Sequence, residues 1–295
     1  GIDFLYKKNK VSKYIGTAKL ITPNKIEIIN DNEKEVINAK NIIIATGSEP
    51  THLPNINVDE KQIVTSTGAL DLKEVPKKMI VIGAGVIGLE MGTVWRRLGS
   101  EVEVIEYLPR ILPGMDNEIA EKFLKILQKQ GLNFKLSHSV ESSKSINGKV
   151  ELVIKNVENK KLEKLEADVV LVAVGRRPNT NGLGLKDLKL DTDKYGFINV
   201  NDKFETSVPN IYAIGDVIKG PMLAHKAEED GVAAVEIING EAGHVDYNLV
   251  PGIIYTSPEV AVIGKTEEEL KANGLDYNKG VFPLSANSRA KAINH

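Results

Sequence analysis

The most regular hydrophobic pattern in the chain covers residues 78–106. Residues 79–82 form an uninterrupted apolar run, which is typical of a parallel strand buried on both faces. A helix is predicted from about Val86 to Leu98, and Gly99 is suited to end it because glycine readily adopts the left-handed conformation found there. A second strand is predicted at residues 101–105. The pattern therefore indicates a strand–helix–strand unit.

Glycines join the first strand to this helix with the spacing G-x-G-x-x-G. Gly83 allows a sharp turn, Gly85 leaves room for a pyrophosphate against the backbone, and Gly88 lets the helix pack closely on the strand. The helix N-terminus points backbone N–H groups and the positive end of its dipole at the same place. A plain structural turn is the alternative, but the strand before the motif and the helix after it favour a dinucleotide site.

An acidic residue closes the second strand. Glu106 lies 18 residues after Gly88, close to where this type of unit places the carboxylate that accepts a hydrogen bond from a ribose 2′-hydroxyl. A 2′-phosphate would meet like charge there, so Glu106 favours NAD over NADP. Arg110, four residues further on, weakens this preference.

Similar patterns predict elements on both sides of the unit. Residues 1–40 suggest an antiparallel meander with strands at 14–20 and 25–29. Further strands are expected at 42–45, 133–140, 150–155, 162–166, 169–174, 197–200 and 210–214, with a hairpin turn at Asn147-Gly148. Helices are expected at 116–130, 222–239 and 266–273. In the second of these we expect Ala224, Ala227, Val232 and Val235 inward, and Glu228, Glu229 and Asp230 outward.

Composition narrows the classes of function. The chain has 295 residues and a formal net charge of −2, which gives no indication of nucleic acid or an anionic membrane as a partner. No apolar run approaches the ~18 residues of a membrane span. There is no cysteine, so these residues hold no disulfide or thiol redox centre, and the histidines lack the spacing of metal ligands. The start at Gly1 and the end in mid-pattern at His295 suggest a piece of a longer protein.

Three predicted strands end in small or polar residues that suit nucleotide binding, since ligands of α/β sheets bind beyond the carboxyl ends of the strands. These ends are Thr46-Gly47, Gly175 and Gly215-Asp216. The Asp216 carboxylate can accept hydrogen bonds from vicinal hydroxyls of a ribityl or ribose chain, or it can cap a turn. The helix that begins near Met222 can direct backbone N–H groups at an electron-rich ring edge.

Several longer segments, taken together, resemble one family. These segments, in family order over nearly the whole chain, are NIIIATGSEP, VIGAGVIGLEMG, GRRPNT, PNIYAIGDV, GPMLAHKAEEDG, YTSPEVA and FPLSANSRAK. They resemble the dihydrolipoamide dehydrogenases, which are α/β flavoproteins of the two-dinucleotide-binding-domain disulfide oxidoreductase family. GPMLAHKAEEDG and residues 78–99 separate the chain from the glutathione, thioredoxin and mercuric reductases.

The resemblance implies a domain order and two cofactor sites. Residues 1–76 would be the C-terminal part of an FAD-binding domain, 77–199 a Rossmann-like NAD-binding domain, 200–246 the return segment of the FAD-binding domain, and 247–295 the start of a dimerisation domain. FAD would contact Ala18, Thr46, Gly47, Ser48, Asp216, Met222, Leu223, Ala224 and His225. NAD would contact Gly83, Ala84, Gly85, Val86, Ile87, Gly88, Leu89, Glu90, Glu106, Val140 and Gly175.

The resemblance also implies an activity. It is the flavin-dependent oxidation of dihydrolipoamide, carried by an acyltransferase subunit of 2-oxo-acid dehydrogenase complexes, with NAD as the acceptor. A homodimer is implied, in the mitochondrial matrix of a eukaryote or otherwise in the cytoplasm. Two alternatives stay open: a non-catalytic NAD-binding module, and a sister flavin enzyme that acts on another disulfide or as an oxidase.

The chain departs from the family at several points. The N-terminal FAD fingerprint, the redox-active cysteine pair and the C-terminal His–Glu pair are missing. Glu90 resembles the family acid that pairs with a lysine beside the flavin, but that lysine is missing too, and an exposed helix acid is the alternative. No residue present is nominated as catalytic nucleophile or base, and we expect these 295 residues alone not to retain FAD.

Overall fold

The computed structural model describes residues 1–31 and 33–293 of the chain. The chain divides into two compact units, which are described separately. The first unit comprises Gly1–Glu49 and Arg177–Tyr247, and the second comprises Pro50–Arg176 and Asn248–His295. The chain passes between them within β5 (Ser48–Pro50), within β14 (Arg176–Pro178) and after Tyr247. The second unit begins earlier in the sequence than residue 77 because β6 (Ile63–Val64) belongs to its main sheet.

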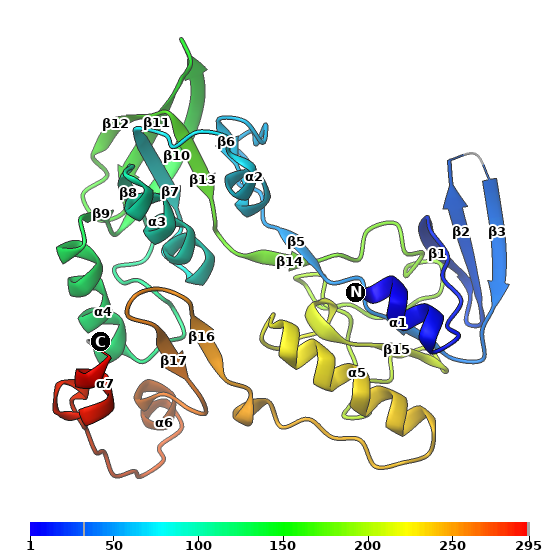
Figure 1. Ribbon diagram of the computed structural model, residues 1–295. Helices are drawn as coiled ribbons and strands as arrows, with labels where there is room; N and C mark the ends of the chain where they lie inside the picture. The colour runs from blue at the N-terminus through cyan, green and yellow to red at the C-terminus, as the bar shows by residue number, and fades with distance from the viewer. Residues whose placement is uncertain (32, 294–295) are drawn as a thin grey trace. The chain divides into compact units, whose positions relative to one another are not determined.

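A five-stranded parallel sheet forms the centre of the second unit (Figure 1). Its order is β6, β13 (Val169–Val172), β7 (Lys78–Ile82), β8 (Glu101–Ile105) and β9 (Leu132–Lys135). The predicted strand–helix–strand unit is confirmed, since α3 (Val86–Leu98) connects β7 to β8 and Gly99 ends it with φ of 114°. The accompanying helices are α2 (Ser66–Asp71) and α4 (Asn117–Lys129).

The two faces of this sheet are covered differently. Alternate residues such as Met79 and Val81 pack with Leu89 of α3 and Phe123 of α4. The residues between them, such as Ile80, pack against an antiparallel sheet of β10 (His138–Ile146), β11 (Lys149–Asn156) and β12 (Leu162–Ala167). Burial on both faces explains why β7 is apolar without interruption.

The hairpin at Asn147-Gly148 is confirmed, because both residues have positive φ angles, 51° and 80°, between the paired strands β10 and β11. The single strand predicted at 133–140 is wrong. The chain breaks at Ser137, which has φ of 56°, so that β9 joins the parallel sheet and β10 joins the antiparallel one.

The end of the chain adds short elements to the second unit. They are β16 (Gly252–Ile254), β17 (Val260–Val262), α6 (Glu267–Ala272), η3 (Leu284–Ala286) and α7 (Ser288–Ala292). Before them, η2 (Tyr247–Leu249) begins at the last residue of the first unit. Ile254 and Val260 join the same core as α3 and α4. The predicted helix at 266–273 is confirmed as α6, whose N-cap Thr266 and Glu269 form a capping box.

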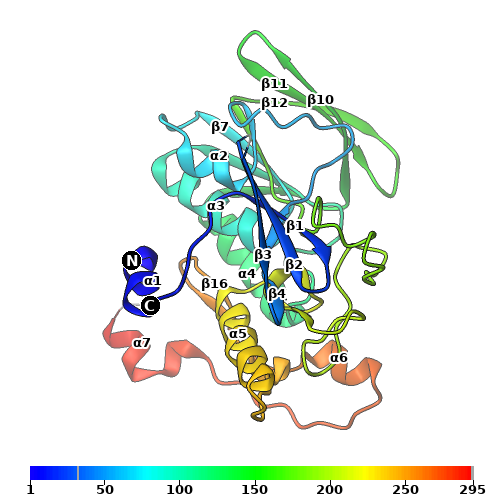
Figure 2. The same ribbon diagram turned by 90° about the vertical axis from the view of Figure 1, so that its right-hand side faces the viewer.

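The first unit begins with a helix that the sequence pattern did not predict, α1 (Ile2–Lys8), none of whose residues is buried. The predicted meander follows as β1 (Thr17–Thr22), β2 (Lys25–Asn30) and β3 (Glu33–Asn38), drawn in blue in Figures 1 and 2. Next come β4 (Ile42–Ile44) and its parallel partner β15 (Ile211–Ala213), then η1 (Gly215–Val217) and α5 (Ala224–Ile238).

Two predictions in this unit are wrong. Residues 197–200 do not form a strand, because only Ile198 makes isolated bridges, to Thr192 and Ile218. The inward face of α5 is also wrong, since Val232 and Val235 are more than half exposed. The buried residues are Lys226, Asp230, Ala233 and Ala234. The hydrophobic pattern misplaces this face because an acid and a base lie inside as an ion pair.

Candidate cofactor-binding sites

The three glycines of the turn after β7 have three different environments. Gly83 has φ of 105°, and a Cβ there would lie 2.4 Å from the carbonyl oxygen of Ala173. A Cβ on Gly88 would lie 2.1 Å from the carbonyl oxygen of Gly83, so α3 packs directly on the turn. Around Gly85, in contrast, a Cβ would meet nothing within 4 Å. The turn therefore combines close packing on either side with open space at its middle glycine.

Glu106 is held beside this turn by the backbone. Its side chain is largely buried, with 9% exposed. One carboxylate oxygen accepts the N–H of Ala84 over 2.7 Å, and the other accepts the N–H of Leu108 over 2.8 Å. These bonds fix the carboxylate at the end of β8, next to the open space at Gly85.

Arg110 points into its own loop. Its guanidinium donates to the carbonyl oxygens of Ile111, Leu112 and Met115 and to the side chain of Asn117. The N–H of Leu112 in turn donates to the carbonyl oxygen of Ala84 over 2.9 Å. Arg110 thus stabilises the loop that closes on the glycine turn, and its donors are engaged within that loop.

The other residues expected at the NAD site are spread over neighbouring elements. Strands β13, β7 and β8 are adjacent and parallel, so Gly175, Gly83 and Glu106 all follow strand ends at one edge of the sheet. Val86 is exposed and Ile87 is partly exposed in the first turn of α3. The side chain of Leu89 is fully buried, so Leu89 can offer a ligand only its backbone. The side chain of Val140 is partly buried and packs on the core.

Glu90 has a partner that the sequence did not indicate. Its Oε1 accepts the backbone N–H of Tyr255 over 2.7 Å, which ties α3 to the segment after β16. The side chain is partly exposed. Glu90 therefore holds a later part of the chain in place within the second unit.

The first unit brings together two segments that were singled out separately. Strands β4 and β15 are parallel neighbours, and their carboxyl ends carry Thr46-Gly47-Ser48 and Gly215-Asp216. The hydroxyl of Ser48 donates to Oδ2 of Asp216 over 2.6 Å. The hydroxyl of Thr46 donates to the carbonyl oxygen of Asn179 over 2.6 Å, and Gly47 has φ of 69°. A partly exposed carboxylate is thereby fixed at a strand end.

The helix expected to face a flavin begins close to these strand ends in the sequence. Met222 and Leu223 precede α5 and are partly exposed, while Ala224 and His225 form its exposed first turn. The N-cap residue Leu223 makes no side-chain hydrogen bond to this N-terminus, where the positive end of the helix dipole lies. Ala18 lies in β1 opposite Ile28 of β2, and in the described part of the chain no hydrogen bond joins it to the other residues of this site.

Sequence reasoning missed three residues beneath Asp216. Lys226 and Asp230 form a fully buried ion pair, and the hydroxyl of Tyr247 donates to Asp230. Burial and the neighbouring carboxylate of Asp230 raise the pKa of the Tyr247 hydroxyl well above its usual range. The spacing of Lys226 and Asp230, i and i+4 on a predicted helix, was the available signal.

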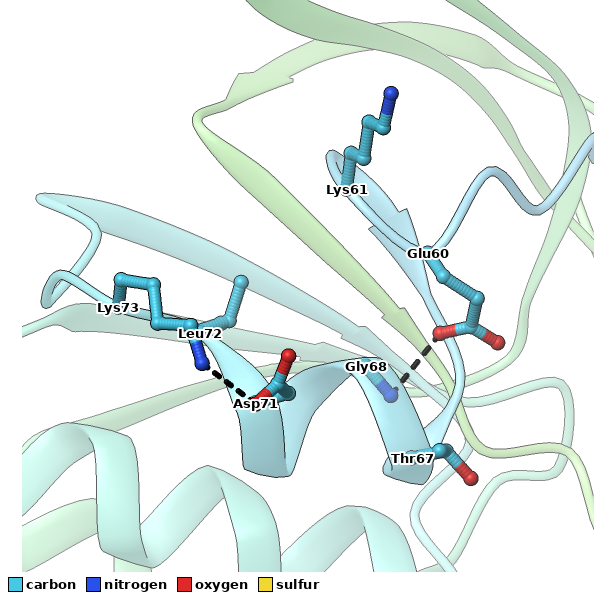
Figure 3. A pocket seen from close by; sticks show the side chains of 7 residues that line it. All are labelled: Glu60, Lys61, Thr67, Gly68, Asp71, Leu72 and Lys73. Atoms are coloured by element: carbon cyan, nitrogen blue, oxygen red, sulfur yellow. Dashed lines mark hydrogen bonds and ion pairs between the residues drawn. The ribbon is translucent and has the colours of Figure 1, made fainter.

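A separate surface pocket lies beside α2 (Figure 3). Its lining residues are Glu60, Lys61, Thr67, Gly68, Asp71, Leu72 and Lys73. The carboxylate of Glu60 is already engaged by the N–H groups of Thr65 and Gly68, and Asp71 pairs with Lys73. None of the expected cofactor residues lines this pocket, and three of its charged groups, Glu60, Asp71 and Lys73, are already engaged within the protein. We therefore assign no cofactor to it.

Within 1–31 and 33–293, no three side chains of the types that bind metals lie close enough together to hold an ion. In the same residues, no helix has the length and apolar character needed to cross a membrane.

Comparison with known proteins identifies the class. Residues 1–231 match the model of the pyridine nucleotide-disulphide oxidoreductase family, and residues 250–295 match the dimerisation domain of that family. The chain belongs to this family. The class of α/β flavoprotein expected from the sequence is confirmed.

The relatives are more specific. The chain is 56% identical over 296 residues to dihydrolipoyl dehydrogenase 1, mitochondrial, of Arabidopsis thaliana, with 100% of the chain and 58% of that protein covered. It is also 56% identical to the mitochondrial dihydrolipoyl dehydrogenase of Dictyostelium discoideum, covering 99% of the chain and 60% of the relative. The chain thus spans a little over half the length of these relatives, and the resemblance to dihydrolipoamide dehydrogenases is confirmed.

Solved structures agree with this family. The crystal structure of LpdA from Mycobacterium tuberculosis matches with a TM-score of 0.90 and 25% identity, covering 99% of this chain and 65% of that one. The HOCl-induced flavoprotein disulfide reductase RclA from Escherichia coli matches with a TM-score of 0.86 and 27% identity, covering 99% and 68%.

Proposed function

We propose that this chain forms the central part of a flavin-dependent dihydrolipoyl dehydrogenase. In this proposal it binds NAD at the glycine turn and contributes part of an FAD site. The identity to curated dihydrolipoyl dehydrogenases supports this reading over a sister flavin reductase. The observation that carries the NAD site is the open space at Gly85, between two glycines whose positions tolerate no side chain.

At the NAD site, each part of the turn has a separate task. The backbone N–H groups at the start of α3 and its dipole stabilise the negative charge of a pyrophosphate lying over Gly85. The carboxylate of Glu106 accepts a hydrogen bond from the adenosine ribose, while its bonds to Ala84 and Leu108 keep it from turning away. The contacts of Val140 and Gly175 complete the site in this proposal.

The residues of the first unit fit the polar chain of a flavin. Asp216 offers a carboxylate that is partly exposed and already oriented by Ser48, which suits the vicinal hydroxyls of a ribityl group. Residues 222–225 bring the uncapped start of α5, whose positive dipole end stabilises negative charge on an electron-rich ring. When bound, a flavin links two-electron thiol chemistry to hydride transfer. The chain's own contribution is to bind and orient.

Substrate, partners and location follow from the same proposal. The substrate is dihydrolipoamide carried by an acyltransferase subunit, and the protein works as a homodimer. Residues 250–295, which match a dimerisation domain, support the dimer. The mitochondrial names of several relatives support the mitochondrial matrix as the location in a eukaryote.

The test is an assay of the complete gene product that contains this chain. We expect NAD reduction that depends on dihydrolipoamide, with a flavin spectrum in the purified protein. Glutathione disulfide and oxidised thioredoxin, each supplied with NADH or NADPH as the reductant, serve as control substrates. A protein that reduces one of these and leaves dihydrolipoamide unreacted would be a sister reductase, and one that binds NADH without reducing any disulfide would be a binding module.

A further inference from the structure

A buried polar cluster lies behind Asp216 in the first unit. The side chains of Lys226 and Asp230 are 0% exposed, and Nζ lies 2.7 Å from Oδ2. The hydroxyl of Tyr247 donates to Oδ1 of Asp230 over 2.9 Å, and Nζ of Lys226 lies 4.9 Å from the centre of the Tyr247 ring. Each oxygen of Asp230 and the cation of Lys226 therefore have defined partners.

The cluster holds the residue that precedes Asp216 by both of its backbone polar groups. The N–H of Gly215 donates to Oδ2 of Asp230 over 3.0 Å, and Nζ of Lys226 donates to the carbonyl oxygen of Gly215 over 3.0 Å. Gly215 has φ of 70°, and a Cβ there would approach the Cβ of Ala227 to 3.1 Å. Side chains of α5 thus hold the bend that presents Asp216. We call the two hydrogen bonds that join Gly215 to Lys226 and Asp230 the clamp.

Stability alone is a poor explanation for this arrangement. Removing two charges from water is costly, and well-packed apolar side chains of similar volume commonly stabilise a core as well as a buried ion pair does. Apolar side chains cannot, however, pair with the N–H and the carbonyl of Gly215. The particular property of the cluster is that it sets the directions of the two peptide groups on either side of Gly215.

We propose that Lys226, Asp230 and Tyr247 are positioning residues for the flavin. They fix Gly215, so that the Asp216 carboxylate stands in the orientation that accepts from the ribityl hydroxyls and from Ser48. Because Lys226 and Asp230 lie on α5, the same clamp couples Asp216 to the helix start at Ala224. The inference rests on the proposed function, since it assumes that a flavin binds at Asp216.

The variant that tests the clamp is Tyr247→Phe, which removes one hydroxyl and keeps the ion pair. A matched control exists in the same unit. Tyr195 also has a lysine over its ring, Lys194 at 4.9 Å, but it is 68% exposed. Both variants are made in the complete gene product, stripped of flavin, and titrated with FAD by flavin fluorescence. Thermal unfolding of each stripped protein checks the fold.

We expect Tyr247→Phe to weaken FAD binding about tenfold, as for the loss of one hydrogen bond to a buried charge, and Tyr195→Phe to leave it unchanged. In an Asp216→Asn background, Tyr247→Phe should have no further effect on FAD affinity, because the clamp acts through Asp216. A purely structural role would give the same loss in both backgrounds. Asp230→Asn is the stronger variant, and if it fails to fold, Tyr247→Phe decides alone.

The outcomes separate the two proposals. If the unmodified protein binds no FAD, the proposed flavin site is wrong and the clamp with it. If it binds FAD and Tyr247→Phe binds equally tightly, the flavin site stands and the clamp is wrong. Equal losses in both backgrounds also overturn the clamp.

Discussion

The hydroxyl of Ser48 donates to the carboxylate of Asp216 over 2.6 Å, although 168 positions separate the two residues in the sequence. The bond exists because β4 and β15 are parallel neighbours, so both residues follow strand ends at the same edge. The serine hydroxyl orients the carboxylate, which can then accept hydrogen bonds from a ligand. The bond therefore allows a test of the proposed FAD site.

Replacing Ser48 with alanine should weaken FAD binding. The bond to a charged acceptor is lost, and Asp216 is free to rotate, so we expect a several-fold rise in the dissociation constant in the complete gene product. FAD titration by fluorescence measures it. Ser207→Ala is the control, because Ser207 accepts a hydrogen bond from the Asp191 N–H elsewhere in the same unit. Equal affinities for the Ser48 variant and the unmodified protein would contradict the assignment.

Gly85 and Gly88 should respond to alanine in opposite ways. Gly85 has φ of −80° and ψ of −175°, which alanine adopts freely, and a Cβ there meets open space. We expect Gly85→Ala to keep its stability and to weaken NADH binding by about tenfold or more, because the methyl group occupies the place of the pyrophosphate. NADH fluorescence and thermal unfolding of the 295-residue chain measure both properties.

Gly88→Ala is the matched comparison. Its Cβ would lie 2.1 Å from the carbonyl oxygen of Gly83, so α3 must move away from β7. We expect a loss of stability of about 1–3 kcal/mol, the usual cost of overpacking. If Gly88→Ala were as stable as the unmodified chain, or Gly85→Ala bound NADH normally, the assigned tasks of these glycines would be wrong.

Glu106 should decide between NADH and NADPH. Glu106→Gln places an amide where two backbone N–H groups now meet a carboxylate, and it removes the charge that repels a 2′-phosphate. We expect NADH to bind about tenfold more weakly. The ratio of the NADPH dissociation constant to the NADH dissociation constant should therefore fall. Arg110→Met is the control. Because Arg110 donates to carbonyl oxygens of its own loop, that variant should lower the melting temperature and leave the NADH-to-NADPH preference unchanged.

A charge cluster should make the attachment of α6 sensitive to acid. Nζ of Lys279 lies 2.7 Å from carboxylate oxygens of both Glu118 and Glu267. Hydrogen bonds from lysines, first Lys122 for Glu118 and Lys271 for Glu267, lower the pKa of each carboxyl from 4.5 to about 2. A lowered folded-state pKa gives stability that is present above pH 4.5 and is lost as the pH falls towards 2.

The matched variant is Lys279→Met, which leaves the other lysines in place. The melting temperature of the unmodified chain should exceed that of the variant at neutral pH, by a small and salt-dependent amount because these groups are all exposed or partly exposed to water. The difference should shrink as the pH falls from about 4.5 to about 2. A difference that stays constant over this range would show that the contact is not electrostatic.

The sequence predicted the NAD-side unit closely because every local signal there agrees. A buried apolar strand, the glycine spacing and the stop at Gly99 all specify the same turn and helix, and the structure has α3 at Val86–Leu98 as expected. The same agreement explains why the hairpin at Asn147-Gly148 was found.

Other features depend on contacts distant in sequence, and local patterns cannot show them. Lys226 and Asp230 read as exposed residues until their partners Gly215 and Tyr247 are known, so α5 was given the wrong buried face. The bond between Ser48 and Asp216 depends on the pairing of β4 with β15, which no local spacing predicts. The helix α1 has seven residues, none of them buried, which is shorter than the window of about 11–18 residues in which a helical hydrophobic period can be recognised.

The proposal that the glycine turn binds NAD is tested most directly by titrating the 295-residue chain with NAD and monitoring the backbone amide chemical shifts. We expect saturable shifts concentrated at Ala84 to Leu89, near Glu106 and at Gly175, with the amides around Ser48 and Asp216 unchanged. The same titration of Gly85→Ala should require about tenfold more NAD or more. An absence of saturable shifts at the glycine turn, or saturation centred elsewhere in the chain, would contradict the central claim that this turn is the NAD site.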